Sequence, residues 1–344
     1  MKNIKNIYCF ILRIQRAQII CSFTIIFLIC FFFCWNNFYS FSESKCDFSV
    51  KYFRSTAYQL LSLHEMPDLG VPKSRIGNIP PFEYQITKQE RMTMYRLLAV
   101  FDKTMKENGI PFFIHSGTLL GSYRNHDFIP WDDDIDVFVS VAERSQLEKV
   151  FYNKNVSNLI LYYTPTHDKI YFSNDSVSGS KYGWRWPYID ISFYNTNGTH
   201  LFDLSPTYGQ YDTYPKSIIF PLTNRPLFTM NLPSPKDAYA YCVWSYGFSD
   251  DCVMNYYSHI TENLMTKYVK VKCKVFANKY PYVKRYRTDN SVIEELLFKG
   301  RVIQRIKVNE PLYAISKSFG FVLQKGYPYP TDVSLPNQNH KGIF

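Results

Sequence analysis

The sequence predicts a mixed α/β domain, because segments with helical periodicity alternate with short apolar runs of strand length. This alternation extends from about residue 87 to residue 193, and it is typical of helices that cover a sheet. Of the 344 residues, 46% are hydrophobic and 18% are aromatic. Such a composition suffices for a core of one or two domains and argues against a disordered chain.

The most clearly predicted helix covers residues 87–109. Thr87 and Glu90 have the spacing of a capping box, and Gly109 suits the position just after a helix end. The apolar residues between them share one helical face, which we expect to pack on the core: Met94, Leu97, Leu98, Phe101 and Met105.

Shorter elements follow along the chain. Strands are predicted at residues 111–115, 134–140, 159–163, 170–173, 188–193 and 268–275, and helices after the small-residue turn 116–122 and at 141–152 and 234–244.

An N-terminal helix is predicted to anchor the chain in a membrane. Residues 19–35 carry no charge, and about 17–25 apolar residues suffice to span a bilayer. Only basic charges precede this segment, so the N-terminus is expected in the cytosol. A cleaved signal peptide is the alternative, although the small residues typical of a cleavage site are missing. We therefore expect a single-pass type II protein of the Golgi or ER membrane with a lumenal body.

The expected organisation has five segments. They are a cytosolic tail (1–17), a transmembrane signal anchor (18–36), a stem (37–85), a catalytic domain (86–257) and a C-terminal extension packed on that domain (258–344).

Sequons and cysteines beyond the anchor agree with a lumenal body. Three N-glycosylation sequons have Asn155, Asn174 and Asn197 as acceptors. The cysteines on the same side of the anchor are Cys46, Cys242, Cys252 and Cys273. A disulfide between Cys242 and Cys252 is the simplest pairing because it closes a short loop. A zinc site on the last three cysteines is the alternative, but their spacing is unlike a CxxC knuckle.

The net charge of +10 suits polyanionic partners in general, including phosphates and nucleotides. Basic and aromatic residues also alternate over residues 279–287, a composition that can bind nucleic acid. We expect no nucleic-acid partner, since a lumenal protein rarely meets one. A solvated face is expected there, with binding of a charged glycan or nucleotide as the alternative.

The chemistry is predicted to lie on Asp132, Asp133, Asp134 and Asp136. Side chains two apart on a strand share a face, so Asp134 and Asp136 project together. Two such carboxylates repel unless a cation neutralises them, and oxygen-rich sites suit Mg²⁺ or Mn²⁺. The other two aspartates would be further ligands or supporting groups. The alternative is a solvated acidic turn. The apolar residues within 135–139 argue against it, because they favour a buried strand.

A turn of small residues precedes the acidic run. Gly117, Thr118, Gly121 and Ser122 place amides at a helix start, where a phosphate can bind. Such a turn, followed about a dozen residues later by an Asp-x-Asp strand, is the layout of the nucleotidyltransferase fold. That fold needs a third carboxylate on a neighbouring strand, and Asp190 between apolar residues is the candidate.

Two segments around these residues resemble the LicD/fukutin family. They are HSGTLLGSYR (115–124) and FIPWDDDIDV (128–137), and the resemblance is long and ungapped. Residues 184–191 and 214–222 are similar to downstream blocks of the family, more loosely. The resemblance covers about residues 87–247.

This resemblance implies a nucleotidyltransferase-like core and an activity. Members transfer an alcohol phosphate, phosphocholine or ribitol phosphate, from a CDP-activated donor to a sugar and release CMP. The implied metal ligands are Asp134 and Asp136, with Asp132, Asp133 and Asp190 near them. Arg124 would face a phosphate, and pairing with one of the aspartates is its alternative. The glycan of a glycoprotein or glycolipid is the expected acceptor.

Two other functions fit part of this pattern. A Golgi glycosyltransferase would share the topology and an Asp-x-Asp site, but it would not place the glycine turn directly before the acids. A non-catalytic lumenal partner of such an enzyme predicts a missing carboxylate, and none is missing. The oligomeric state stays open.

Overall fold

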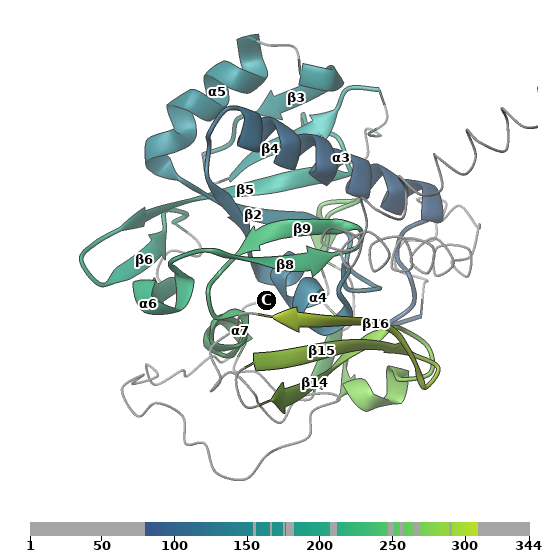
Figure 1. Cartoon of the computed structure of the whole chain (residues 1–344). Helices are drawn as coiled ribbons and strands as arrows, with labels where there is room; N and C mark the ends of the chain where they lie inside the picture. Colours follow the sequence, from purple (N-terminus) through teal and green to yellow (C-terminus); the bar gives the residue numbers. More distant parts are fainter. Residues whose placement is uncertain are drawn as a thin grey trace, which may run out of the picture. The chain divides into compact units, whose positions relative to one another are not determined.

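The computed structural model describes residues 80–153, 156–165, 167–174, 176, 182–206, 212–246, 251–254, 257–264, 269–288 and 291–308 (Figure 1). All of them belong to one compact unit, Ser55–Phe344. The expected cytosolic tail, the membrane anchor and nearly all of the stem lie outside these residues, as does Asn155. Among the helices that are described, none is both long and apolar enough to cross a membrane.

The unit is built on a seven-stranded mixed sheet in the order β1-β2-β5-β4-β3, with β6 paired to β5 and β7 to β6. Its strands are β1 (Phe112–Ile114), β2 (Ile135–Ser140), β3 (Leu159–Tyr162), β4 (His167–Phe172), β5 (Tyr188–Thr196), β6 (His200–Asp203) and β7 (Thr213–Pro215). β2 and β5 run parallel, and the other neighbouring pairs are antiparallel. The predicted mixed α/β class is confirmed, as are the strands predicted between residues 111 and 193, with small shifts at their ends.

Helix α3 (Lys88–Glu107) confirms the first predicted helix and its caps. Thr87 Oγ1 accepts from the Glu90 amide at 3.1 Å, and the Glu90 carboxylate accepts from the Thr87 amide at 2.7 Å. Gly109 follows the helix end with a φ of +65°, a conformation that glycine adopts without strain. The predicted apolar face is buried in the main core.

The remaining helices are η2 (Val141–Glu143), α5 (Arg144–Asn153), η3 (Val156–Asn158), α6 (Lys216–Ile219) and α7 (Ala238–Tyr246). α7 starts later than predicted, because Asp237 caps it by accepting from the Ala240 amide at 2.8 Å. Ser234 belongs instead to the hairpin of β8 (Thr223–Leu227) and β9 (Met230–Ser234).

Helix α4 (Ser116–Asn125) links the two ends of the unit. It packs against β2, α7 and β8, and also against β14 (Tyr282–Thr288). Figure 1 shows it between β2 and a second sheet, formed by β14, β15 (Ser291–Phe298) and β16 (Arg301–Val308). Gly121 permits close packing of the segment 127–129 on α4, because an added Cβ would lie 2.5 Å from the Asp127 carbonyl oxygen.

Short pairs of strands lie between these parts. β10 (Asp251–Met254) pairs with β13 (Val269–Lys272), and β11 (Tyr257–Ser258) pairs with β12 (Asn263–Leu264). The strand predicted at 268–275 is therefore confirmed as far as Lys272, after which the chain enters η4 (Cys273–Phe276).

The disulfide joins Cys252 to Cys273, with Cα atoms 4.9 Å apart. Cys242 lies in α7, where it is buried and reduced. The predicted Cys242–Cys252 bond is thus wrong, and so is the alternative zinc site, because two of its three ligands are bonded to each other. Loop length guided the prediction, whereas the pairing of β10 with β13 brings Cys252 and Cys273 together.

The basic segment 279–287 is only in part a solvated face. Arg285 is 1% exposed, and its guanidinium pairs with Glu294, its neighbour on β15. Glu294 also pairs with Arg225 at 2.9 Å and with His126 Nε2 at 2.7 Å. We call these four buried side chains the Glu294 cluster. Its contacts correct the expectation of a solvated face at Arg285.

Candidate active site

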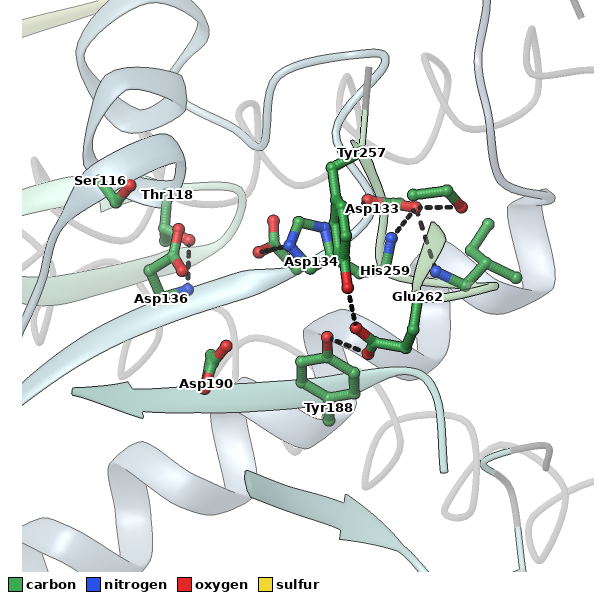
Figure 2. A network of polar contacts seen from close by, with 12 residues as sticks. Ser116, Thr118, Asp133, Asp134, Asp136, Tyr188, Asp190, Tyr257, His259 and Glu262 are labelled. Carbon is green, nitrogen blue, oxygen red and sulfur yellow. Dashed lines mark hydrogen bonds and ion pairs between the residues drawn. The ribbon is translucent and has the colours of Figure 1, made fainter. Parts of the chain in front are cut away.

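Two predicted catalytic aspartates lie side by side on the parallel pair of strands. Asp136 of β2 is the register partner of Asp190 of β5, so both carboxylates project from one face of the sheet (Figure 2). Asp134 immediately precedes β2, and its charge acts on Asp136 together with that of Asp190. The structure therefore brings Asp134, Asp136 and Asp190 together.

The first turn of α4 lies directly against these carboxylates. An added Cβ at Gly117 would be 2.6 Å from Asp132 Oδ2 and 3.6 Å from Asp136 Oδ2, so a side chain has no room there. Thr118 Oγ1 accepts from the Asp136 amide at 2.8 Å, which fixes the helix to β2. Helix N-termini favour anions, so this turn suits a site that handles phosphate.

The rest of the predicted phosphate-binding set lies further along α4. Ser122 Oγ donates to the Pro226 carbonyl at 2.7 Å, and Gly121 supports the packing described above. Arg124 Nη2 donates to the Asp251 carbonyl at 3.2 Å, near the helix end opposite Gly117. A phosphate contact of these residues stays a prediction, and Gly117 is the member of the set that touches the carboxylates.

Asp133 has a different environment from its neighbours. Its carboxylate accepts from the amides of His259 and Ile260 at 3.0 and 3.3 Å and from Ser258 Oγ at 3.3 Å. Asp133 Oδ1 also lies 2.9 Å from His259 Nδ1. Asp133 thus fixes the turn after β11 to the start of β2.

His259 bridges two aspartates of the acidic run. While Nδ1 contacts Asp133, Nε2 lies 3.2 Å from Asp134 Oδ2 (Figure 2). Burial by itself would lower the pKa of His259, but the charge of Asp134 and the contacts with Asp133 raise it well above its ordinary value. Sequence reasoning missed His259, because no motif surrounds it. It also lies far along the chain from the predicted site, with 122 residues between it and Asp136.

Glu262 completes the loop between β11 and β12. It accepts from Tyr188 Oη at 2.6 Å, from Trp184 Nε1 at 2.9 Å and from Tyr257 Oη at 2.8 Å. These three bonds satisfy a buried carboxylate and fix three aromatic rings, of which Figure 2 shows Tyr188 and Tyr257 beside the acidic cluster. The sequence contains no signal that would predict this arrangement.

Lys169 sets the charge of Asp190. Lys169 Nζ lies 2.9 Å from Asp190 Oδ2 and 3.9 Å from the centre of the Tyr188 ring. Burial would raise the pKa of Asp190, but the charge and hydrogen bond of Lys169, together with the charges of His167 and His259, outweigh it and hold that pKa below its ordinary value. Asp190 Oδ1 is buried and has no hydrogen-bond partner within the described part of the chain.

The other carboxylates are short of positive charge. Burial raises the pKa of Asp132 and Asp136 well above the ordinary value, and repulsion from neighbouring aspartates raises it further. Burial also raises the pKa of Asp134, which the charge of His259 offsets only in part. Buried acids that repel one another are typical of a site built to hold a cation.

The donor set fits a divalent metal ion. Asp133, Asp134 and His259 each offer one ligand atom, and these atoms lie within 4.8 Å of one another. Asp132 and Asp136 add carboxylate oxygens, which Mg²⁺ and Mn²⁺ prefer, while an imidazole nitrogen suits Mn²⁺ better than Mg²⁺. Since Asp133 already binds His259 Nδ1, it can orient Nε2 toward a metal, as carboxylates commonly do.

The two predicted glycosylation sites within the described residues are exposed. Asn174 lies in the turn after β4, and Asn197 lies between β5 and β6. Their accessibility allows modification, which stays a prediction.

Comparison with known families agrees with this geometry. Residues 109–237 match the family described as LicD/FKTN/FKRP, nucleotidyltransferase domain. This segment of the chain is therefore similar to the nucleotidyltransferase domain of that family. The matched segment contains Gly117, the acidic run and Asp190, whereas His259 and Glu262 lie beyond it.

Individual relatives are distant. The chain is 26% identical over 117 residues to the lipopolysaccharide cholinephosphotransferase LicD of Haemophilus influenzae, a match covering 31% of this chain and 44% of that protein. It is 29% identical over 108 residues to the mouse ribitol-5-phosphate transferase FKTN, a match covering 31% of this chain and 22% of that protein. An uncharacterised protein of Rickettsia prowazekii, RP689, is 31% identical over 68 residues, a match covering 20% of this chain and 26% of that protein. The chain thus spans less than half the length of each of these relatives.

Proposed function

We propose that this chain is a metal-dependent phosphotransferase that moves an alcohol phosphate from a CDP-activated donor to a sugar hydroxyl and releases CMP. The observation that carries the proposal is the register pairing of Asp136 with Asp190, with the first turn of α4 against the carboxylates of Asp132 and Asp136. Similarity of residues 109–237 to this family supports the reaction class, and the distant relatives LicD and FKTN suggest the two candidate groups, phosphocholine and ribitol phosphate.

A divalent cation would be held by Asp134 and His259, which form one group of possible ligands with Asp133, and Asp136 and Asp132 would add carboxylate oxygens. Asp133 would orient the imidazole. Because the pKa of His259 is raised, its imidazole would have to release a proton to bind the metal. When bound, the cation would neutralise negative charge on the diphosphate and on the leaving CMP. The raised pKa values of Asp132, Asp134 and Asp136 support this assignment, because a cation relieves their repulsion. The imidazole ligand favours Mn²⁺ as the metal.

The bond changes follow from an in-line displacement. The sugar oxygen bonds to the phosphorus next to the alcohol, the bond from that phosphorus to the bridging oxygen breaks, and CMP leaves with that oxygen. Asp190 Oδ1 takes the hydroxyl proton, since it is the buried carboxylate oxygen of this site that lacks a partner among the described residues. Lys169 holds the other oxygen of Asp190 and keeps the carboxylate ionised before the transfer.

We also propose a lumenal body anchored by residues 18–36 in a Golgi or ER membrane, with a glycan as acceptor. The Cys252–Cys273 disulfide supports an oxidising compartment. The exposed acceptors Asn174 and Asn197 support the same location. Treatment of the cellular protein with an N-glycosidase should lower its mass, and a mass that does not change would contradict the lumenal assignment.

The activity is tested by incubating the purified full-length chain with Mn²⁺, a sugar acceptor and CDP-choline, CDP-ribitol, CDP-glycerol or UDP-sugars. We expect CMP release from a CDP donor and no turnover of UDP-sugars. Asp136→Asn should lower the rate at least about 100-fold. Asp251→Asn is the matched control, because its carboxylate pairs with Lys270 and Lys272 away from the site.

Turnover of a UDP-sugar in place of CDP donors would favour the glycosyltransferase alternative. Equal rates for the wild type and Asp136→Asn would overturn the site assignment. No turnover of any donor would favour the non-catalytic alternative.

A further inference from the structure

A pair of stacked aromatic rings lies next to the acidic cluster and has no role in the chemistry above. The ring centroids of Tyr182 and Trp184 are 4.4 Å apart, and their planes differ by only 6°. Tyr182 is 42% exposed, whereas Trp184 is partly buried. The pair therefore presents an aromatic surface at the edge of the site.

Groups that belong to the site hold Trp184 in place. Its Nε1 donates to Glu262 Oε1 at 2.9 Å, and Lys169 Nζ lies 5.1 Å from the centre of its ring. The same Nζ is 2.9 Å from Asp190 Oδ2. The Trp184 ring and the Asp190 carboxylate therefore share one ammonium group as a neighbour and lie close to each other.

A third ring supports the stack from the side. Tyr162 meets Trp184 edge to face, with centroids 5.5 Å apart. Gly183 makes this approach possible, since an added Cβ would lie 2.8 Å from the Tyr162 hydroxyl oxygen. The pair is thus braced by Tyr162, Glu262 and Lys169, although Tyr182 remains well exposed.

We propose that Tyr182 and Trp184 form the binding surface for the nucleobase of the donor, which stacks on Tyr182 while its diphosphate reaches the acidic cluster. This inference rests on the proposed function. A flat base matches a flat aromatic face, and stacking of this kind tolerates different bases. The short separation of Trp184 and Asp190 shows that the stacked pair borders the acidic cluster, where the diphosphate of a nucleotide would lie.

The charges near the stack exclude a different occupant. A quaternary ammonium such as choline binds between aromatic rings when no cation is already there. Here Lys169 Nζ lies over the rings of both Trp184 and Tyr188, so a cationic group would meet a like charge. An uncharged planar ring meets no such repulsion.

The test measures binding of CMP and of ribose 5-phosphate to the full-length chain in the presence of Mn²⁺. Ribose 5-phosphate has the sugar and a phosphate but no base. We expect Tyr182→Ala to weaken CMP binding about tenfold and to leave ribose 5-phosphate binding unchanged. Tyr182→Phe keeps the ring and should bind CMP as the wild type does. Tyr163→Ala is the matched control, because Tyr163 is 45% exposed and lies one residue beyond β3, outside the stacked pair.

The outcomes separate this inference from the proposed function. If the wild type binds CMP and Tyr182→Ala binds it equally well, the base-binding surface is refuted while the proposed function stands. An equal loss of CMP and ribose 5-phosphate binding would also refute it, as would a change confined to the KM of the acceptor. A wild type that neither binds CMP nor releases it would overturn both proposals.

Discussion

The two ends of α4 carry two clusters of charge with opposite electrostatics. At its C-terminal end, the charges of Arg225 and Arg285 outweigh burial and hold the pKa of Glu294 below its ordinary value. At its N-terminal end, burial and mutual repulsion raise the pKa of Asp132 and Asp136. The side chains of the Glu294 cluster are fully buried, whereas Asp132 and Asp136 are only half-buried.

The balance of charge distinguishes a structural cluster from a functional one. Glu294 receives its counter-charges from β8 and β14, which ties the second sheet to α4 and the β8–β9 hairpin. The acidic run has an excess of carboxylates, which a metal ion can balance. The first cluster is therefore expected to determine stability and the second to determine activity. The following predictions test that difference.

The largest expected change in stability comes from Glu294→Gln. Removing this charge takes a shared carboxylate away from two buried guanidinium groups, Arg225 and Arg285, which should cost about 3–5 kcal/mol of unfolding free energy. Chemical denaturation followed by circular dichroism measures the loss, and CMP affinity of the remaining folded protein should not change. A loss below about 1 kcal/mol would contradict the structural role of the Glu294 cluster.

Mn²⁺ is expected to stabilise the protein through the acidic cluster. At a concentration one hundred times its Kd, a ligand that binds only the folded state contributes about 2.7 kcal/mol. Thermal unfolding should therefore shift upward with Mn²⁺ in the wild type. In Asp134→Asn the shift should be much smaller, whereas Glu294→Gln should retain it. A full shift in Asp134→Asn would argue against a metal on this residue.

Acid should weaken the stabilisation that the Glu294 cluster provides. Because the folded-state pKa of Glu294 is lowered, its stabilisation is fully present above the ordinary value of 4.5 and is lost as pH falls below it. Between the wild type and Glu294→Gln, the slope of unfolding free energy against pH should differ in this range by up to about 1.4 kcal/mol per pH unit. Denaturant titrations at several pH values from 5 downward measure the slopes, and parallel slopes would contradict the prediction.

A smaller effect is expected from Gly117→Ala. The new Cβ would press against Asp132 Oδ2, which must shift, so we expect the rate of CMP release to fall about tenfold. Gly198→Ala is the control, since an added Cβ there meets nothing within 4 Å and the sequon is preserved. Equal activity of Gly117→Ala and the wild type would show that the cluster tolerates displacement of Asp132.

Much of the fold followed from local patterns. The capping residues Thr87 and Glu90 and the apolar face of α3 are encoded within one helix, and the strands up to residue 193 have their own apolar runs. Asp136 and Asp190 were also predicted locally, because each lies in a recognisable buried strand.

The remaining contacts of the site could not be predicted in this way. His259 and Glu262 lie on a short hairpin whose residues carry no periodic signal, and Lys169 meets Asp190 only because β4 pairs with β5. The burial of Arg285 and the Cys252–Cys273 bond were missed for the same reason, since each depends on strands that pair across the chain.

The sequence by itself determined the α/β class, the resemblance to the LicD/fukutin family and the aspartates of the acidic cluster, because strand alternation and a contiguous motif are local properties. Only the tertiary structure decided that Asp133 anchors His259, that Lys169 neutralises Asp190 and that Tyr182 and Trp184 border the site. These relations depend on distances between residues far apart in the chain. Such distances are fixed by how the strands pair and by how α4 packs between the two sheets.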